Sequence, residues 1–407
     1  MTTGLIADSD GRLPRSPERS ASSVALAGLA ALAVAMGIGR FAFTPILPMM
    51  QADAGLSVAA GGWLASANYL GYLVGSVAAI RMHPAPETAI RSGLLAIGIA
   101  TLGMGFAPGI ALWIALRVLA GIASAWVLIF VSAWCLERLA SARRPVLAST
   151  VFAGVGTGIA AAGVVCLVLM WRQVASADAW IVLGTLSLLV TGVIWPVFGL
   201  HEAGRGAARE RGERPPRWDG DAVRLILCYG AWGFGYIIPA TFLPMLAREV
   251  VQDPAVFGWA WPIFGAASVA AAFAAAACSK FIGNRRLWAL SHVMMAVGVI
   301  LPVIWTGILA IMCAAFLVGS TFMVATMTGM QEARHVHGAG AKALMAAMTS
   351  AFALGQILGP VLVSFLSGGS GGVSSGLVAA CALLLMSAYA LARPRPAPVA
   401  TTHLEFD

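Results

Sequence analysis

The sequence contains little charge, and this scarcity excludes most soluble folds. Only 10% of its 407 residues are Asp, Glu, Lys or Arg, whereas soluble globular chains carry roughly a quarter. Apolar residues make up 60% of the chain. A lipid bilayer is therefore the expected solvent, and the length leaves room for about twelve helical spans of ~20 residues each.

The sequence also lacks the patterns of several other protein classes. Its six cysteines stand singly in apolar runs, without metal-ligand spacing or a disulfide framework. The net charge of +8 comes from short arginine clusters rather than from a basic stripe with interleaved aromatics, which argues against nucleic-acid binding. No nucleophile, base or carboxylate pair clusters near one membrane face. We therefore expect no catalytic centre, no cofactor and no metal.

Charged residues, Pro/Gly clusters and polar turns divide the chain into twelve apolar spans. The predicted spans are 23–50, 57–80, 88–107, 109–136, 146–170, 179–200, 221–246, 255–279, 287–305, 308–331, 343–367 and 373–392. The first run is too long for the apolar region of a signal peptide, so it is expected to remain as a span. The expected fold class is an all-α polytopic membrane protein.

The basic residues predict how the chain is oriented in the membrane. Of the 25 lysines and arginines, Arg40 and Arg117 lie within spans and Arg172 and Arg248 in odd-numbered loops, leaving 21 in the tails and even-numbered loops. Positive charge is retained on the cytoplasmic side. We therefore expect both termini in the cytoplasm.

One long polar stretch divides the chain into two sets of six spans. The predicted organisation is a cytoplasmic tail (1–22), an N-terminal half (23–200), a cytoplasmic linker (201–218), a C-terminal half (219–392) and a second cytoplasmic tail (393–407). The linker arginines are interpreted as solvated charges that hold the linker inside, with binding to anionic lipid as the alternative.

An internal repeat relates the two halves. A shift of 196 residues gives nine identities in twenty-nine positions, including a Leu-Pro-Met run and a Gly-Trp pair in one register. In addition, Gly154 and Gly158 correspond to Gly355 and Gly359 at a shift of 201. Spaced glycines let helices approach closely. The repeat indicates duplication of a six-helix unit, with a solute site expected at midplane between the halves.

Two segments carry a family resemblance. Residues 37–50, GIGRFAFTPILPMM, and 62–72, GWLASANYLGY, resemble the YbfB/YjiJ family of major facilitator transporters, and Arg117 and Gly121 resemble the fourth-span motif of the wider superfamily. The resemblance implies two pseudo-symmetric six-helix halves, alternating access, and a location in the bacterial inner membrane. It also implies that spans one, four, seven and ten line the cavity. The fifth span lacks the Gly-Pro associated with antiporters, so import and export both remain open.

Arg40 and Arg117 are the first candidates for function, because charge at membrane depth is costly. Asp and Glu are absent from every predicted span interior. A carboxylate on the solute would suit an unpaired guanidinium, which leads to the hypothesis of an organic anion. The alternative is that either arginine binds carbonyls freed around Gly37, Gly39 or Gly121.

Further solute contacts are predicted from polar and aromatic residues at helical spacing. Asn68 and Tyr72 share a face of the second span, Trp232 and Tyr236 share a face of the seventh, and Gln356 lies in the eleventh. Helix bridging by Asn and packing by Trp or Tyr are the alternatives. The predicted hinge or packing positions are Gly37, Gly39, Pro45, Pro48, Gly121, Gly154, Gly158, Gly355, Gly359 and Pro360.

The predicted function is secondary transport of a small solute by a monomer in contact with the lipid bilayer. A sensor that binds solute without moving it, or a membrane-embedded enzyme, are the alternatives. Protons are a candidate coupling ion, although only the two arginines are ionisable at depth. His292 lies near the inner end of the ninth span, and solvation is its expected role.

Overall fold

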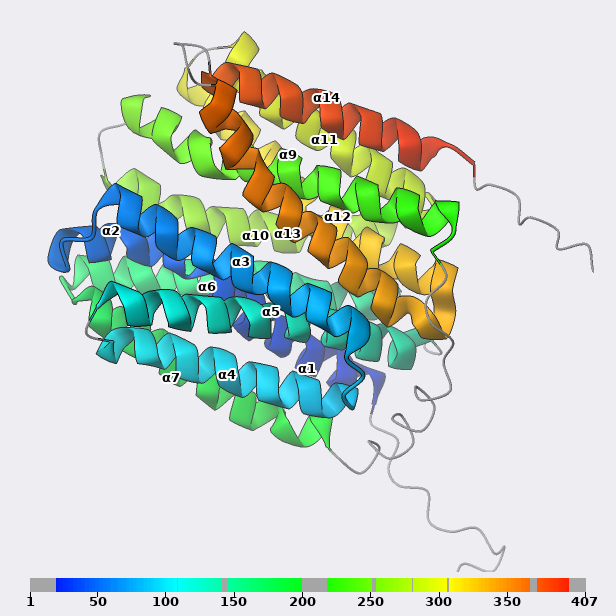
Figure 1. The fold of residues 1–407 in the computed structure, drawn as a ribbon, viewed down its shortest axis with the longest axis horizontal. Helices are drawn as coiled ribbons and strands as arrows, with labels where there is room; N and C mark the ends of the chain where they lie inside the picture. Colours follow the sequence, from blue (N-terminus) through cyan, green and yellow to red (C-terminus); the bar gives the residue numbers. More distant parts are fainter. Residues whose placement is uncertain are drawn as a thin grey trace, which may run out of the picture.

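The computed structural model describes residues 20–107, 109–140, 145–199, 218–250, 254–279, 281–305, 307–366 and 372–394. Within these ranges the fold is all-helical, and twelve helices are long and apolar enough to cross a membrane. The helices lie roughly side by side in one bundle (Figure 1). The predicted linker lies outside the described residues except for Trp218, as do most of both predicted tails.

The N-terminal half contains six spans, the first of which is built from three consecutive segments. The first span comprises α1 (Ala21–Leu32), η1 (Ala33–Phe41) and α2 (Phe43–Asp53). The others are α3 (Val58–Arg81), α4 (Pro86–Phe106), α5 (Ile110–Leu139), α6 (Pro145–Trp171), and α7 (Ser176–Ile194) with its short extension η3 (Trp195–Phe198). Each corresponds to a predicted span.

The C-terminal half contains the other six. These are α9 (Gly220–Val250), α10 (Pro254–Cys278), α11 (Asn284–Ile304), α12 (Ile308–His337), α13 (Ala341–Leu366) and α14 (Gly372–Ala392), with the short turn η5 (Gly338–Gly340) before α13. Successive spans run in opposite directions. We call the end of the bundle where α1 begins and α14 ends the proximal end, and the opposite end the distal end (Figure 1).

The repeated glycines lie at equivalent helix crossings in the two halves. A Cβ on Gly154 would lie 2.0 Å from the carbonyl oxygen of Leu29 in α1, and a Cβ on Gly355 would lie 2.4 Å from that of Gly230 in α9. Each half therefore packs its fifth helix against its first with backbone touching backbone, a contact that only glycine permits.

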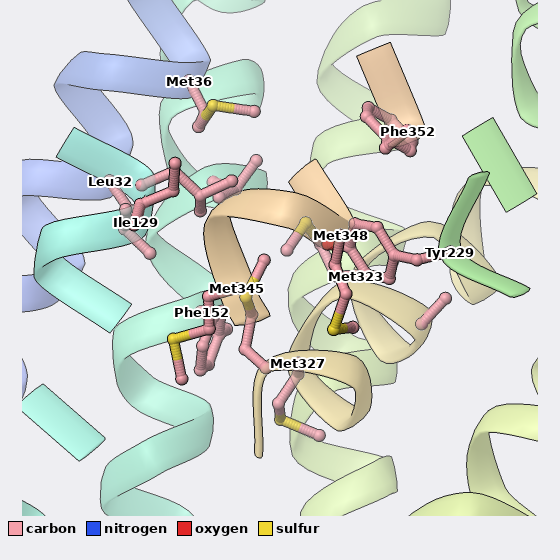
Figure 2. Packing of buried hydrophobic residues seen from close by; sticks show 14 of the residues in the cluster. Leu32, Met36, Ile129, Phe152, Tyr229, Met323, Met327, Met345, Met348 and Phe352 are labelled. Carbon is pink, nitrogen blue, oxygen red and sulfur yellow. The ribbon is translucent and has the colours of Figure 1, made fainter. Parts of the chain in front are cut away.

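Methionine side chains dominate part of the contact between the halves. Met323 and Met327 of α12, with Met345 and Met348 of α13, lie opposite residues of the N-terminal half that include Met36, Ile129 and Phe152 (Figure 2). Methionine has no branch and fills irregular spaces. Such a contact is suited to two bodies that move relative to one another.

The first span changes its helical pattern just before Pro45. Residues Ala33–Phe41 form a π-helix, in which each carbonyl is paired with the N–H five residues later. Pro45 has no N–H, so the carbonyl of Arg40 lacks this partner. The predicted weakening of the helix near Pro45 and Pro48 therefore takes the form of a nine-residue π segment at the middle of the span.

Ion pairs at the proximal end link helices within each half, and their polarity is inverted between the halves. In the N-terminal half Glu87 of α4 accepts from Arg138 of α5 at 3.2 Å. In the C-terminal half Arg285 of α11 donates to Glu332 of α12 at 2.5 Å and also to Asp221 of α9. The sequence patterns did not predict either pair.

His292 differs from the solvated position expected for it. Its side chain is fully buried, accepts from Trp288 Nε1 at 2.9 Å, and lies 3.0 Å from Ser387 Oγ of α14. The expectation was wrong because His292 is more than two turns inside α11, on the face that packs against α14. The histidine connects two helices of the C-terminal half.

Candidate functional site

Arg40 lies at the middle of the first span, buried between the two halves. Its side chain is 3% exposed, and its Nη2 donates to Gln356 Oε1 of α13. Its Cζ lies 4.0 Å from the ring centroid of Tyr72 in α3 and 5.6 Å from that of Phe352 in α13. The structure therefore brings three of the predicted solute-binding residues together, namely Arg40, Tyr72 and Gln356.

Several N–H groups in and around this cluster are buried without a hydrogen-bond partner. They are Arg40 Nε and Nη1, Gln356 Nε2, Trp232 Nε1 and Trp261 Nε1. A buried donor left unpaired costs about 1–3 kcal/mol, and more when it is charged. A molecule with several hydrogen-bond acceptors would satisfy these donors.

Arg40 forms no ion pair with a carboxylate in the part of the chain that the structure describes. Among the described residues, the ion pairs found lie at the proximal end and do not involve Arg40 or Arg117. Tyr72 and Phe352 present aromatic rings to the guanidinium, which stabilise a cation without consuming its hydrogen-bond donors. The charge is thereby tolerated at depth while two of its nitrogens stay available.

Aromatic rings of the C-terminal half form the wall opposite Arg40. Trp232 packs on Phe352 with ring centroids 4.5 Å apart, and Tyr236 stacks on Phe322 at 4.5 Å. Phe322 also meets Phe41, the residue after Arg40, edge to face at 5.7 Å. The predicted contacts Trp232 and Tyr236 thus belong to a continuous aromatic cluster that reaches the cation.

A cavity lies beside this cluster but is almost closed. It offers about 10 Å³ to the centre of a water molecule, which is room for about one water. Its lining includes Met36, Tyr72, Trp232, Phe322 and Phe352. The cavity is too small for an organic solute, and we call this arrangement the closed state.

Arg117 lies close to Arg40 but is engaged by the backbone. It donates to the carbonyls of Leu64, Gly39 and Arg40, each at 3.4 Å. The last of these is the carbonyl that Pro45 leaves without a π-helical partner. This arrangement matches the alternative hypothesis for Arg117, in which the arginine binds carbonyls freed around Gly39.

Asn68 is hydrogen-bonded to the backbone of Arg117. It is fully buried, and its Nδ2 donates to the carbonyl of Arg117 at 3.1 Å. A Cβ on Gly121 would lie 2.2 Å from the carbonyl oxygen of Asn68, so α3 and α5 are in backbone contact here. Asn68 therefore bridges helices in the closed state, while Arg40 and Gln356 face the other half.

The sequence patterns missed the aromatic residues that complete the site. Phe322 and Phe352 lie in spans ten and eleven, Phe41 in span one and Trp261 in span eight. Phenylalanine is common in membrane spans, so only its distance from Arg40 distinguishes these residues. A cluster contributed by four helices leaves no local signal.

Comparison with known proteins agrees with this fold. A family model described as "Uncharacterised MFS-type transporter YbfB" matches residues 32–392. The chain belongs to this family. No curated protein matches the sequence. The crystal structure of the human organic anion transporter MFSD10 (TETRAN) is similar, with a TM-score of 0.69, 15% identity, and coverage of 93% of this chain and 100% of that chain.

Family membership identifies a membrane transporter of the major facilitator type. Alternating access is typical of this fold, and the twelve helices make the chain a multi-pass membrane protein. At 15% identity the likeness to MFSD10 establishes the fold alone.

Proposed function

We propose that this YbfB-family transporter moves a small organic anion by secondary transport, and that Arg40 binds the anionic group. The observation that carries the proposal is a buried guanidinium with two unpartnered nitrogens and, among the described residues, no ion pair to a carboxylate. A carboxylate on the solute would accept from Nε and Nη1, the two-pronged geometry that arginine favours.

The contact between Arg40 and Gln356 gives the site a means of sensing occupancy. It joins the N-terminal half to the C-terminal half through one hydrogen bond. An anion bound to Arg40 competes with Gln356 Oε1 as acceptor, while Gln356 Nε2, which has no partner, can donate to the same anion. Solute would therefore replace a direct contact between the halves with a bridged one, and the direct contact would form again once solute leaves.

The proposal includes a cellular setting. The arginines at the proximal end favour its placement in the cytoplasm of a bacterial cell, with the chain in the inner membrane as a monomer. Proton cotransport with the anion is our proposed coupling. An inward proton gradient should then accelerate anion uptake into liposomes, and a protonophore should abolish the acceleration.

Flux through purified protein tests the function directly. Proteoliposomes containing the protein should accumulate radiolabelled organic anions down an imposed gradient, and empty liposomes give the background. Arg40→Gln should reduce protein-dependent uptake by at least about tenfold, since a hydrogen bond to a charged group contributes about 1.5–3 kcal/mol. Arg40→Lys should recover only part, because an ammonium lacks the planar fork.

Arg172→Gln is the matched control, because Arg172 is an exposed arginine in the turn between α6 and α7. It should transport at the wild-type rate. Normal anion uptake by well-folded Arg40→Gln would overturn the role of Arg40. Saturable binding without any flux would favour a sensor and overturn transport.

A further inference from the structure

The hydrogen-bonding groups around Arg40 restrict the chemistry of the solute beyond its charge sign. Five unpartnered buried nitrogens belong to this region, namely Arg40 Nε and Nη1, Gln356 Nε2, Trp232 Nε1 and Trp261 Nε1. All five are donors. The unpartnered buried side-chain oxygens in the part of the chain that the structure describes are Asn68 Oδ1, Ser132 Oγ and Ser187 Oγ, and none of these residues lines the cavity beside the aromatic cluster. The ligand must therefore supply acceptors and few donors.

The number of available cations restricts the solute charge. Arg40 has free nitrogens, whereas Arg117 already donates from Nε, Nη1 and Nη2 to three carbonyls. A dicarboxylate would leave its second charge without a partner in a buried site, which is strongly unfavourable. An amino acid would need a carboxylate for its ammonium, and no described ion-pairing carboxylate lies at Arg40. A single negative charge fits best.

The walls restrict the shape of the remainder. Aromatic rings surround Arg40 and Phe41. Tyr236 stacks on Phe322 at 29°, and Trp232 lies tilted at 31° to Phe352. Phe41 meets Phe322 edge to face. These pairs now fill the space, since the adjacent cavity holds about one water. When the halves separate, a flat ring can take the place of one member of a pair and keep the stacking.

On these grounds we infer that the solute is a planar aromatic monocarboxylate. Its carboxylate accepts from Arg40 and Gln356, and its ring lies against Phe322 and Phe352. This inference rests on the proposed function, in which Arg40 binds the anion. It adds that the C-terminal half selects for the ring.

Binding of benzoate to the purified full-length protein in detergent tests the inference. Benzoate should bind and quench the fluorescence of Trp232 and Trp261 in a saturable manner. Cyclohexanecarboxylate, which has the same charge but a non-planar ring, should bind about five- to tenfold more weakly, the ratio expected for loss of one aromatic pair. Phthalate, phenylalanine and benzamide should each bind at least tenfold more weakly than benzoate.

Two variants separate the parts of the site. Phe322→Leu keeps an apolar wall without a ring, so benzoate and cyclohexanecarboxylate should bind within twofold of each other. Arg40→Gln should lose both ligands while retaining a monodisperse elution profile. If Phe322→Leu does not purify as a monodisperse protein, Phe352→Leu makes the same test on the other ring of the wall.

The outcomes distinguish the two proposals. Equal binding of benzoate and cyclohexanecarboxylate to wild type, with loss of both in Arg40→Gln, would overturn the aromatic selectivity and leave the anion function standing. Equal binding of benzamide and benzoate, unaffected by Arg40→Gln, would overturn both. Tighter binding of phthalate or phenylalanine than of benzoate would overturn the assignment of a single charge.

Discussion

The two halves share one helix arrangement but present different chemistry to each other. The first helix of the N-terminal half carries Arg40, whereas the repeat-related position of the C-terminal half is Tyr236. The second helix shows the same contrast, because Asn68 corresponds to Phe264. The N-terminal half supplies the cation, whereas the C-terminal half supplies Gln356 and most of the rings, such as Trp232 and Phe322.

This difference separates features that are the same in both halves from side chains that differ between them. The glycine crossings within each half are equivalent, since they hold the six-helix unit together. The side chains at the contact between the halves have diverged, and the asymmetric site lies there.

Substitution of a glycine at the helix crossings should be equally destabilising in both halves. A Cβ on Gly37 would lie 2.3 Å from the backbone carbon of Gly158, and a Cβ on Gly355 would lie 2.4 Å from the carbonyl oxygen of Gly230. Gly37→Ala and Gly355→Ala should each destabilise the protein by about 3 kcal/mol or prevent folding. Thermal unfolding in detergent measures the effect.

Gly62→Ala is the control for these substitutions. Gly62 is exposed on α3, and a Cβ added there would have no neighbouring atom within 4 Å. Its melting temperature should match the wild type. If Gly37→Ala and Gly62→Ala melt together, the backbone contact does not hold the half.

The inverted ion pairs should differ in strength. The Arg285 side chain is 12% exposed and forms ion pairs with two carboxylates. The Arg138 side chain is 29% exposed and forms an ion pair with Glu87, which also accepts a hydrogen bond from Trp134 Nε1. Removing one member of a buried pair costs about 3–5 kcal/mol, and exposed pairs contribute far less. Arg285→Met should therefore lower the melting temperature clearly more than Arg138→Met does.

Exchanging the charges tests whether polarity matters. The double variant Glu87→Arg/Arg138→Glu gives the N-terminal half the polarity of the C-terminal half. It should recover most, but not all, of the stability lost in Arg138→Glu alone, because the bond from Trp134 to Glu87 is not restored. A double variant less stable than the single variant would argue against a local pair.

The two arginines of the N-terminal half should respond differently to lysine. One ammonium cannot reach the three carbonyls that Arg117 binds, so Arg117→Lys should lower stability by about 1–2 kcal/mol. Benzoate affinity of the folded fraction should stay within about twofold, whereas Arg40→Lys should show the reverse pattern. If Arg117→Lys loses benzoate affinity without losing stability, Arg117 binds the solute and this prediction is wrong.

The smallest effect is expected where α3 meets α13 towards the proximal end. Ser350 Oγ donates to Ser76 Oγ at 3.0 Å, and Lys342 Nζ donates to the carbonyl of Met82 at 3.3 Å. Ser350→Ala should weaken this contact by about 1 kcal/mol or less. A cysteine introduced at Ser149, which is buried in α6, should then react modestly faster with a thiol reagent than in the parent.

Ser92→Ala in the same reporter background is the control, since Ser92 is exposed and bonds only within α4. Unchanged labelling in Ser350→Ala would show that the methionine contact keeps this end closed without the serine pair.

The amino-acid sequence by itself determined the membrane, the twelve spans and the two-fold repeat. Each depends on a local or periodic property: apolar length, the absence of charge, or glycine spacing read along one helix. Arg40 was also predictable, because a charge in an otherwise uncharged span is conspicuous and costly. Its contact with Gln356 and Tyr72 joins residues up to 316 positions apart, and no pattern in the chain specifies it.

Only the tertiary structure decided how the two arginines divide their roles. In the sequence both are cations within an apolar span, and both are candidates for binding the solute. The π segment before Pro45 frees a carbonyl that Arg117 then binds, while Arg40 points to the other half with nitrogens to spare. Hydrogen-bond satisfaction depends on neighbours from several helices, so the distinction arises only when those helices pack.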